Sequence, residues 1–247
     1  MAGHSKWANI KHRKTGQDAK RGKLFTQLIR ELMMAAKLGG DEPESNPRLR
    51  SAVSKALSCN MPRDTMNRAI QRGAGGGEGS NLESMLYEGY GPGGTALLVC
   101  CLTDNRNRTV AEVRHAFDKC GGNLGSDGSV AYLFDRKGVI HLPGQFDEEE
   151  LLTLVIEAGA DDLQGDPQAL SIVLTPPEQL VFVQQALEQQ RYPVQQAEIS
   201  WIARTSLTLD TTSAERLKTL LERLDDLDDV QAIYHNAELP DEFELVS

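Results

Sequence analysis

The feature that most limits how this chain can fold is a glycine-rich stretch at residues 73–80, with the sequence GAGGGEGS. Five of its eight residues are glycine, and glycine weakens a helix or strand by roughly 0.5–1 kcal/mol relative to alanine. The stretch therefore predicts a flexible linker and a domain boundary. A chain of 247 residues has room for two or three domains, so this boundary separates a small N-terminal domain from a larger remainder.

Charge divides the chain at the same place. Residues 1–75 carry 15 Lys and Arg against 6 Asp and Glu, a net charge of +9, whereas residues 76–247 carry 11 against 30, a net charge of −19. A difference of this size predicts a basic module that binds a polyanion, attached to an acidic body. The alternative interpretation is that both kinds of charge only solvate the surface.

The basic part is predicted to be helical. From Leu24, apolar residues recur at i, i+4 spacing until Gly39 and Gly40 end the helix. Asn46 before Pro47 is an N-cap signal for a second helix, and Pro62 begins a third. Three short amphipathic helices can bury one small core together.

The remainder is predicted to alternate strands and helices. A strand at 95–103, a helix and a strand at 129–134 form one βαβ unit. Residues 139–203 have the complete βαββαβ order of a ferredoxin-like domain, and a strand at 206–209, a helix and a strand at 230–235 complete the first unit. We therefore predict an α+β multidomain fold in which an N-terminal three-helix domain precedes two ferredoxin-like domains, the second inserted into the first. The expected limits are 1–75 for the basic helical domain, 81–136 plus 205–240 for the α+β domain and 137–204 for the inserted α+β domain.

Sequence signals for catalysis are scarce. The chain has no phosphate loop of the Gly-x-x-x-x-Gly-Lys-Ser/Thr type, and its cysteines and histidines lack metal-ligand spacing. Residues 89–94, GYGPGG, resemble a phosphate cradle, but they precede a strand and no lysine follows, which favours a structural turn. An acidic run at 225–229 ends a predicted helix, where a solvated turn is favoured over a cation or partner site. We therefore predict no enzymatic activity, catalytic residue, metal or cofactor.

Composition also limits where the protein works. The longest uninterrupted apolar run, Ala96 to Leu102, has seven residues, whereas a membrane helix needs about 20. The N-terminus has no apolar signal-peptide core, and four cysteines do not make a disulfide scaffold. We expect a cytoplasmic protein with reduced cysteines and no membrane contact.

The N-terminal segment is the strongest candidate for nucleic-acid binding. Residues 1–23 contain seven basic residues, opposed only by Asp18. Such a segment can lay cations along a phosphate backbone and offer Trp7 or His12 as a stacking surface. The alternatives are a solvated tail for the basic run and a core position for Trp7.

The helices extend this basic surface. Lys23, Arg30 and Lys37 are spaced by seven, which predicts a stripe on the side of the helix away from its apolar face. The second helix repeats this spacing, and the third carries Arg68 and Arg72 as an i, i+4 pair. Asn and Gln are sparse on these faces, so we expect recognition of shape and backbone more than of base sequence. The predicted nucleic-acid-binding residues are Lys6, Trp7, Lys11, His12, Arg13, Lys14, Lys20, Arg21, Lys23, Arg30, Lys37, Arg48 and Lys55.

Several motifs resemble those of the YebC family across essentially the whole chain. The resemblance is densest before residue 140, in MAGHSKWANIKHRK (1–14), DAKRGK (18–23), NPRLR (46–50), YEGYGPGG (87–94), DNRNRT (104–109), CGGNLG (120–125) and GSVAYLF (128–134). It implies a cytoplasmic bacterial protein with a helical N-terminal domain, two α+β domains around a cleft and no catalytic residues. Residues 141–200, with their glutamine-rich stretch, depart most from the family pattern.

The resemblance implies a probable transcriptional regulator that binds DNA, while some family members and mitochondrial relatives are described as translational activators. Our hypothesis is therefore a DNA-binding transcriptional regulator that uses its basic N-terminal domain on the phosphate backbone. A ribosome-associated translation factor that binds ribosomal or transfer RNA is the first alternative. An enzyme with a site near residues 89–94 and 105–108 is the second. We also expect a monomer with a protein partner on the acidic domains.

Overall fold

The computed structural model describes residues 17–75, 81–166 and 168–239, with side chains from residue 22 onward. Contacts between residues divide the chain into two compact units. Tyr132–Ser206 form one unit, and the described residues on either side of this segment form the other. None of the helices in these ranges is long and apolar enough to cross a membrane.

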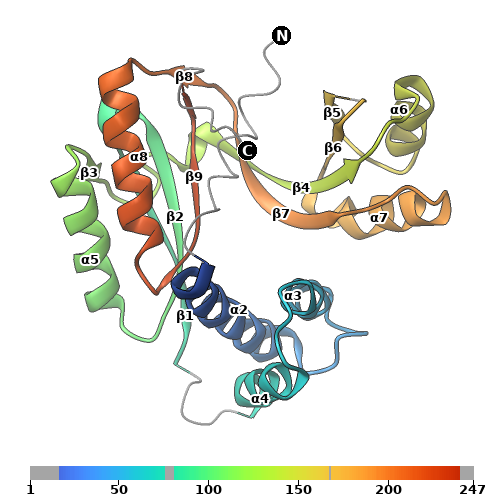
Figure 1. Ribbon diagram of the computed structural model, residues 1–247, viewed down its shortest axis with the longest axis horizontal. Helices are drawn as coiled ribbons and strands as arrows, with labels where there is room; N and C mark the ends of the chain where they lie inside the picture. The colour runs from blue at the N-terminus through green and yellow to red at the C-terminus, as the bar shows by residue number, and fades with distance from the viewer. Residues whose placement is uncertain (1–16, 76–80, 167, 240–247) are drawn as a thin grey trace. The chain divides into compact units, whose positions relative to one another are not determined.

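Three helices form the first part of the larger unit, as the sequence predicts (Figure 1). Asn46 is the N-cap of the second helix, where its side chain accepts a hydrogen bond from the backbone N–H of Leu49. The apolar stripes of the three helices meet in one core that includes Leu32, Leu49 and Met66. The helices are α2 (Gln17–Gly39), α3 (Pro47–Ser58) and α4 (Arg63–Ala74).

The last helix extends further than the sequence suggests. Gly73 was expected to begin the linker, but α4 continues through Ala74 and Gly73 is buried. A Cβ atom at Gly73 would collide with the backbone of Met33 on α2. Gly73 therefore allows α4 to approach α2 closely. The predicted linker is reduced to residues 75–80, and residues 76–80 lie outside the described residues.

A four-stranded antiparallel sheet follows, in the order β3-β1-β2-β9. Two helices pack on one of its faces and share a core that includes Val99, Phe117, Leu217 and Leu220 (Figure 1). The elements are β1 (Glu83–Tyr90), β2 (Ala96–Thr103), α5 (Arg106–Lys119), β3 (Asn123–Leu124), α8 (Thr211–Asp225) and β9 (Val230–His235).

Two predicted strands of this sheet were wrong. Residues 129–134 do not form a strand of it, because Ala131–Leu133 make a 3-10 turn and Phe134 already belongs to the other sheet. The strand predicted at 206–209 is shorter than expected. It is β8 (Leu207–Thr208), which pairs with β10 (Ala237–Glu238) in a separate two-stranded sheet. The strand β1 was not predicted, and the elements of this sheet follow one another as ββαβ and then αβ, so this domain does not have the predicted ferredoxin-like βαββαβ order.

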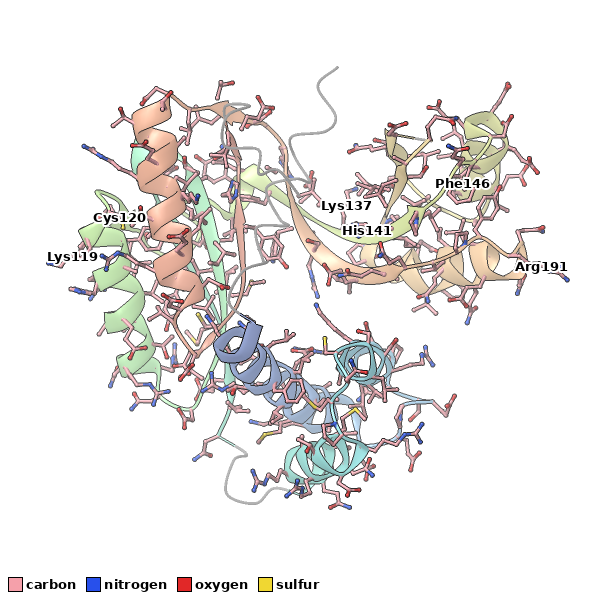
Figure 2. The ribbon with its side chains drawn as sticks, viewed as in Figure 1. Lys119, Cys120, Lys137, His141, Phe146 and Arg191 are labelled. Atoms are coloured by element: carbon pink, nitrogen blue, oxygen red, sulfur yellow. The ribbon has the colours of Figure 1, made fainter. Side chains whose placement is uncertain are left out.

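The smaller unit contains a second antiparallel sheet, in the order β5-β6-β4-β7. Its two helices share one core with the sheet, including Ile140, Val155 and Val183. The ring centroids of Phe146 and Tyr192 lie 5.2 Å apart beside this core. Phe146 is labelled in Figure 2. The elements are β4 (Phe134–Pro143), α6 (Glu148–Glu157), β5 (Asp162–Asp166), β6 (Leu170–Thr175), α7 (Leu180–Gln189) and β7 (Gln196–Ala203).

Candidate nucleic-acid interface

Lys23, Arg30 and Lys37 of α2 contact the α+β part of the same unit. The guanidinium of Arg30 lies 2.9 Å from the carboxylate of Asp229 and also donates to the backbone carbonyl of Asp228. The ammonium of Lys23 lies 4.0 Å from the carboxylate of Asp225. Lys37 donates to the carbonyl of Leu82 at 3.0 Å. All three cations therefore lie next to oxygen atoms of their own chain.

A buried carboxylate is the centre of this contact. Asp229 is only 2 % exposed, and it accepts hydrogen bonds from Thr109 at 2.6 Å, Arg108 at 2.9 Å and Thr103 at 3.0 Å. Burial would raise its pKa, but these hydrogen bonds and the charge of Arg30 hold the pKa below its usual value. We call Asp229 and these four partners the Asp229 cluster.

Apolar and backbone contacts reinforce the same junction. Leu82 and Leu102, from the α+β part, are buried in the core of the three helices. The amide of Gln27 donates to the carbonyl of Val230 at 2.7 Å, and this contact is buried. The helical part is therefore packed against the first sheet and shares a core with it.

These contacts correct two expectations. The stripe of Lys23, Arg30 and Lys37 does not face away from the body of the protein, because each side chain contacts the segment 225–229 or Leu82. The acidic run is not simply a solvated turn, because Asp229 is buried and paired. Complementary charge on the basic helix and the acidic run was the sequence signal for this contact. A role in nucleic-acid binding stays a prediction for all three cations.

Other basic residues lie on the outer surfaces of α3 and α4. Residues 47–75 contain six basic residues and a single acidic one, Asp64. Arg48 makes a double hydrogen bond with Glu31, at 2.7 and 2.9 Å, and this partner raises its pKa. Lys55 is exposed on the same helix. The other exposed basic residues are Arg50, Arg63, Arg68 and Arg72.

The end of α4 carries a feature that the candidate residues did not include. A shallow depression of about 350 Å³ is lined by Arg68, Gln71, Arg72 and Gly75. The i, i+4 spacing of its two arginines was visible in the sequence. Among the remaining candidates, Lys20 and Arg21 lie in α2, but their side chains are not described. The candidates outside the described residues are Lys6, Trp7, Lys11, His12, Arg13 and Lys14.

The glycine-rich turn serves the fold. Residues 91–94 close the β1–β2 hairpin, with Gly93 at a positive φ of 68°, whereas Gly89 and Tyr90 of the predicted turn belong to β1. Just before it, the buried carboxylate of Glu88 accepts from the backbone N–H groups of Gly128, Val130 and Ala131 at 2.7–2.8 Å. Burial would raise the pKa of Glu88, but the three N–H groups lower it. Glu88 thus fixes the segment that leads into β4.

The possible enzyme site near residues 105–108 makes structural contacts in this unit. Arg108 is bound to Asp104 and Asp229 at the start of α5. Burial raises the pKa of the Cys101 thiol to about 12, so the thiol is neutral at physiological pH. The part of the chain that the structure describes contains no group of three His, Cys, Asp or Glu residues placed to hold a metal ion.

Comparison with known proteins identifies the family. The model described as "TACO1/YebC protein N-terminal domain" matches residues 5–76, and "TACO1/YebC second and third domain" matches residues 82–237. The chain belongs to the TACO1/YebC family. A relative from Aeromonas hydrophila, named "Probable transcriptional regulatory protein", is 58% identical over 242 residues and 98% of both chains. A Salmonella typhimurium relative, "Probable transcriptional regulatory protein YebC", is 57% identical over the same share.

A solved family structure agrees with this fold. The crystal structure of the conserved hypothetical protein Aq1575 from Aquifex aeolicus matches with a TM-score of 0.85 and 48% identity. The match covers 97% of this chain and 99% of that one. The TACO1/YebC fold is therefore shared over nearly the full length, which confirms the family resemblance and the α+β class with three N-terminal helices.

Proposed function

We propose that this TACO1/YebC protein is a non-enzymatic transcriptional regulator that binds DNA through its basic N-terminal domain. The observation that carries the proposal is the concentration of charge on α3 and α4, with six basic residues against one acidic residue between 47 and 75. Exposed lysines and arginines neutralise phosphates and release counterions, which is the main source of sequence-independent affinity for nucleic acid. The names of the curated relatives, which are probable transcriptional regulatory proteins, support the same function.

The proposed recognition is of backbone and shape. The basic surfaces carry few Asn and Gln side chains for base edges, so direct readout in the major groove would contribute little. Random duplexes should therefore compete within about tenfold of a promoter site, far less than the 10³–10⁷ typical of sequence-specific regulators. Among the candidates of the sequence analysis, the basic residues of the N-terminal segment, Arg48 and Lys55 are proposed for this binding, with Trp7 and His12 as candidates for stacking on bases.

We also propose the domain organisation in which this surface is presented. A basic helical domain at 1–75 precedes an α+β domain at 81–136 plus 205–240, into which a ferredoxin-like domain at 137–204 is inserted. In support, all four strands of the sheet β5-β6-β4-β7 come from residues 134–203, while β2 and β9 of the other sheet come from either side of this segment. In this proposal the acidic domains offer a surface for a protein partner. The chain itself is monomeric and cytoplasmic.

The test is binding of the full-length chain to a random duplex, a promoter duplex and a structured RNA over a series of salt concentrations. The proposal expects affinity for the duplexes to fall with salt, with a log–log slope of about −0.9 for each phosphate neutralised. A strong preference for structured RNA would instead favour the translation factor. Absence of salt-dependent binding to all three would refute nucleic-acid binding.

A further inference from the structure

We propose that the phosphate-contacting surface is the outer face of α3 and α4, with Arg68 and Arg72 at its centre, and that Lys23 and Arg30 of α2 do not contact the ligand. This inference rests on the proposed function and assigns its contacts to particular residues. It differs from the sequence prediction, which placed Lys23 and Arg30 among the contacts.

Arg30 and Lys23 of α2 are already compensated by carboxylates of their own chain. Arg30 is 18 % exposed and lies 2.9 Å from the carboxylate of Asp229. A phosphate at this position would have to displace that carboxylate, and breaking a buried ion pair leaves an uncompensated charge. Lys23 lies next to Asp225, with its side chain 17 % exposed. Local negative charge from the acidic run also repels an approaching polyanion.

Arg68 and Arg72 keep their positive charge available for a ligand. Arg68 contacts the backbone carbonyl of Asp64 at 3.2 Å, which satisfies one N–H without neutralising the guanidinium. Among the described residues, no acidic side chain forms an ion pair with Arg68 or Arg72, whereas Arg48 on α3 is bound to Glu31. Each guanidinium has about five N–H donors, more than a single carbonyl can satisfy.

The depression at the end of α4 has side chains suited to binding a phosphate. Within the described part of the chain, its lining consists of two guanidiniums, the amide of Gln71 and Gly75, with no carboxylate among them. Side chains at i and i+4 of a helix are neighbours, with Cβ atoms about 5–6 Å apart. The two arginines therefore present a paired set of donors to phosphate oxygens, which are the acceptors that suit guanidinium geometry best.

The helix dipole opposes an anion at this place, and its size can be compared with the arginines. The C-terminal end of a helix carries roughly half a negative charge, which two full guanidinium charges exceed. The competing explanation is that Arg72 only stabilises the negative end of the helix dipole. A structural role of that kind would lower stability on substitution and leave affinity unchanged, so the two roles are separable by experiment.

The experiment compares three double variants of the full-length chain. R68Q/R72Q removes the proposed contacts, K23Q/R30Q removes the compensated cations, and R216Q/R223Q removes two exposed arginines of α8 as a control with the same change in net charge. The probe is a fluorescently labelled random duplex, titrated by anisotropy at several salt concentrations. Inorganic phosphate serves as a second probe, added as a competitor, and thermal unfolding of each variant is recorded in parallel.

We expect R68Q/R72Q to bind the duplex at least tenfold more weakly and to lower the salt slope by about 1.8, for two phosphates at roughly 0.9 each. Its melting temperature should stay close to that of the wild type. K23Q/R30Q should melt earlier, and its folded form should keep the wild-type slope. Duplex should outcompete inorganic phosphate, because the depression holds one phosphate of a longer backbone.

The results that overturn the inference are distinct from those that overturn the proposed function. Three results would each refute this surface while nucleic-acid binding stands. R68Q/R72Q could keep the wild-type affinity and salt slope. R216Q/R223Q could lose as much affinity as R68Q/R72Q, or K23Q/R30Q could lose more of the salt slope than R68Q/R72Q. If the wild-type chain binds no nucleic acid at any salt concentration, the proposed function fails, and this inference fails with it.

Discussion

Substitution of Asp229 by asparagine should weaken the junction between the helical part and the first sheet. The change keeps the shape of the side chain but removes the negative charge. Arg30, which is 18 % exposed, then faces a neutral amide, and the hydroxyls of Thr103 and Thr109 lose a charged acceptor. Arg108 keeps Asp104 as a second partner at 2.8 Å, which limits the loss on its side.

The magnitude follows from these contacts. Removing one partner of a buried ion pair typically costs about 3–5 kcal/mol, and the lower end applies because both arginines retain access to water. We therefore expect a loss of about 3 kcal/mol in the free energy of unfolding, or a fall of about 6–12 °C in melting temperature for a chain of this size. Urea denaturation of the full-length chain measures the change in the free energy of unfolding. D226N is the matched control, because Asp226 is exposed and the charge change is the same.

The pH dependence gives a second readout. Because the pKa of Asp229 is lowered in the folded state, its contribution is fully present above the unfolded pKa of about 3.9 and is lost as pH falls through the folded pKa. The stability difference between D229N and wild type should therefore be constant at neutral pH and shrink below about pH 4. A D229N protein within about 0.5 kcal/mol of the wild type at neutral pH, the range of ordinary surface changes, would refute the role of the Asp229 cluster.

Three further predictions test the rest of the fold. G73A should lower the unfolding free energy by about 1–3 kcal/mol, because the added methyl group meets the backbone of α2; a stabilised G73A protein in urea titration would contradict this close approach. E88Q should cost about 1–3 kcal/mol, because one of the N–H groups bound by Glu88 then faces an amide donor; urea denaturation measures this too, and an unchanged midpoint would show that the carboxylate is not needed. Residues 132–206 should fold alone, with cooperative thermal unfolding by circular dichroism, because their sheet and core are complete; a disordered fragment would contradict the proposed insertion.

Local features of the fold were predictable because they depend on neighbours in sequence. The N-cap Asn46 and the i, i+4 apolar spacing located the helices of the first part. Asp147 was similarly visible as the cap of α6, where it accepts from the N–H of Glu150. The βαββαβ order of the smaller unit appears in its predicted sequence positions, since each strand and helix there has its own apolar pattern.

Long-range pairing was not predictable in the same way. Gly89 and Tyr90 were interpreted as part of the turn 89–94, but both belong to β1. In the structure, Gly89 lies against the ring of Phe117, where a Cβ atom would collide with it. The strand predicted at 206–209 was expected to join this sheet, but β8 within it pairs with β10.

The candidate site shows the same limit. The spacing of Lys23, Arg30 and Lys37 correctly places them on one side of a helix, away from the core of the three-helix part. Periodicity does not tell whether that side meets solvent or another part of the chain. Asp229, which holds Arg30, is about 200 residues away in sequence, so only complementary charge linked the two segments before the structure.

The most direct test of the central claim is a competition experiment with the full-length chain. A promoter duplex, a shuffled duplex and a structured RNA compete for the protein at one fixed salt concentration, and the titration is repeated at higher salt. We predict that the two duplexes compete within about tenfold of each other and that both lose affinity together as salt rises. Discrimination above about a thousandfold for the promoter, as in sequence-specific regulators, or affinity that does not change with salt, would contradict recognition through the phosphate backbone.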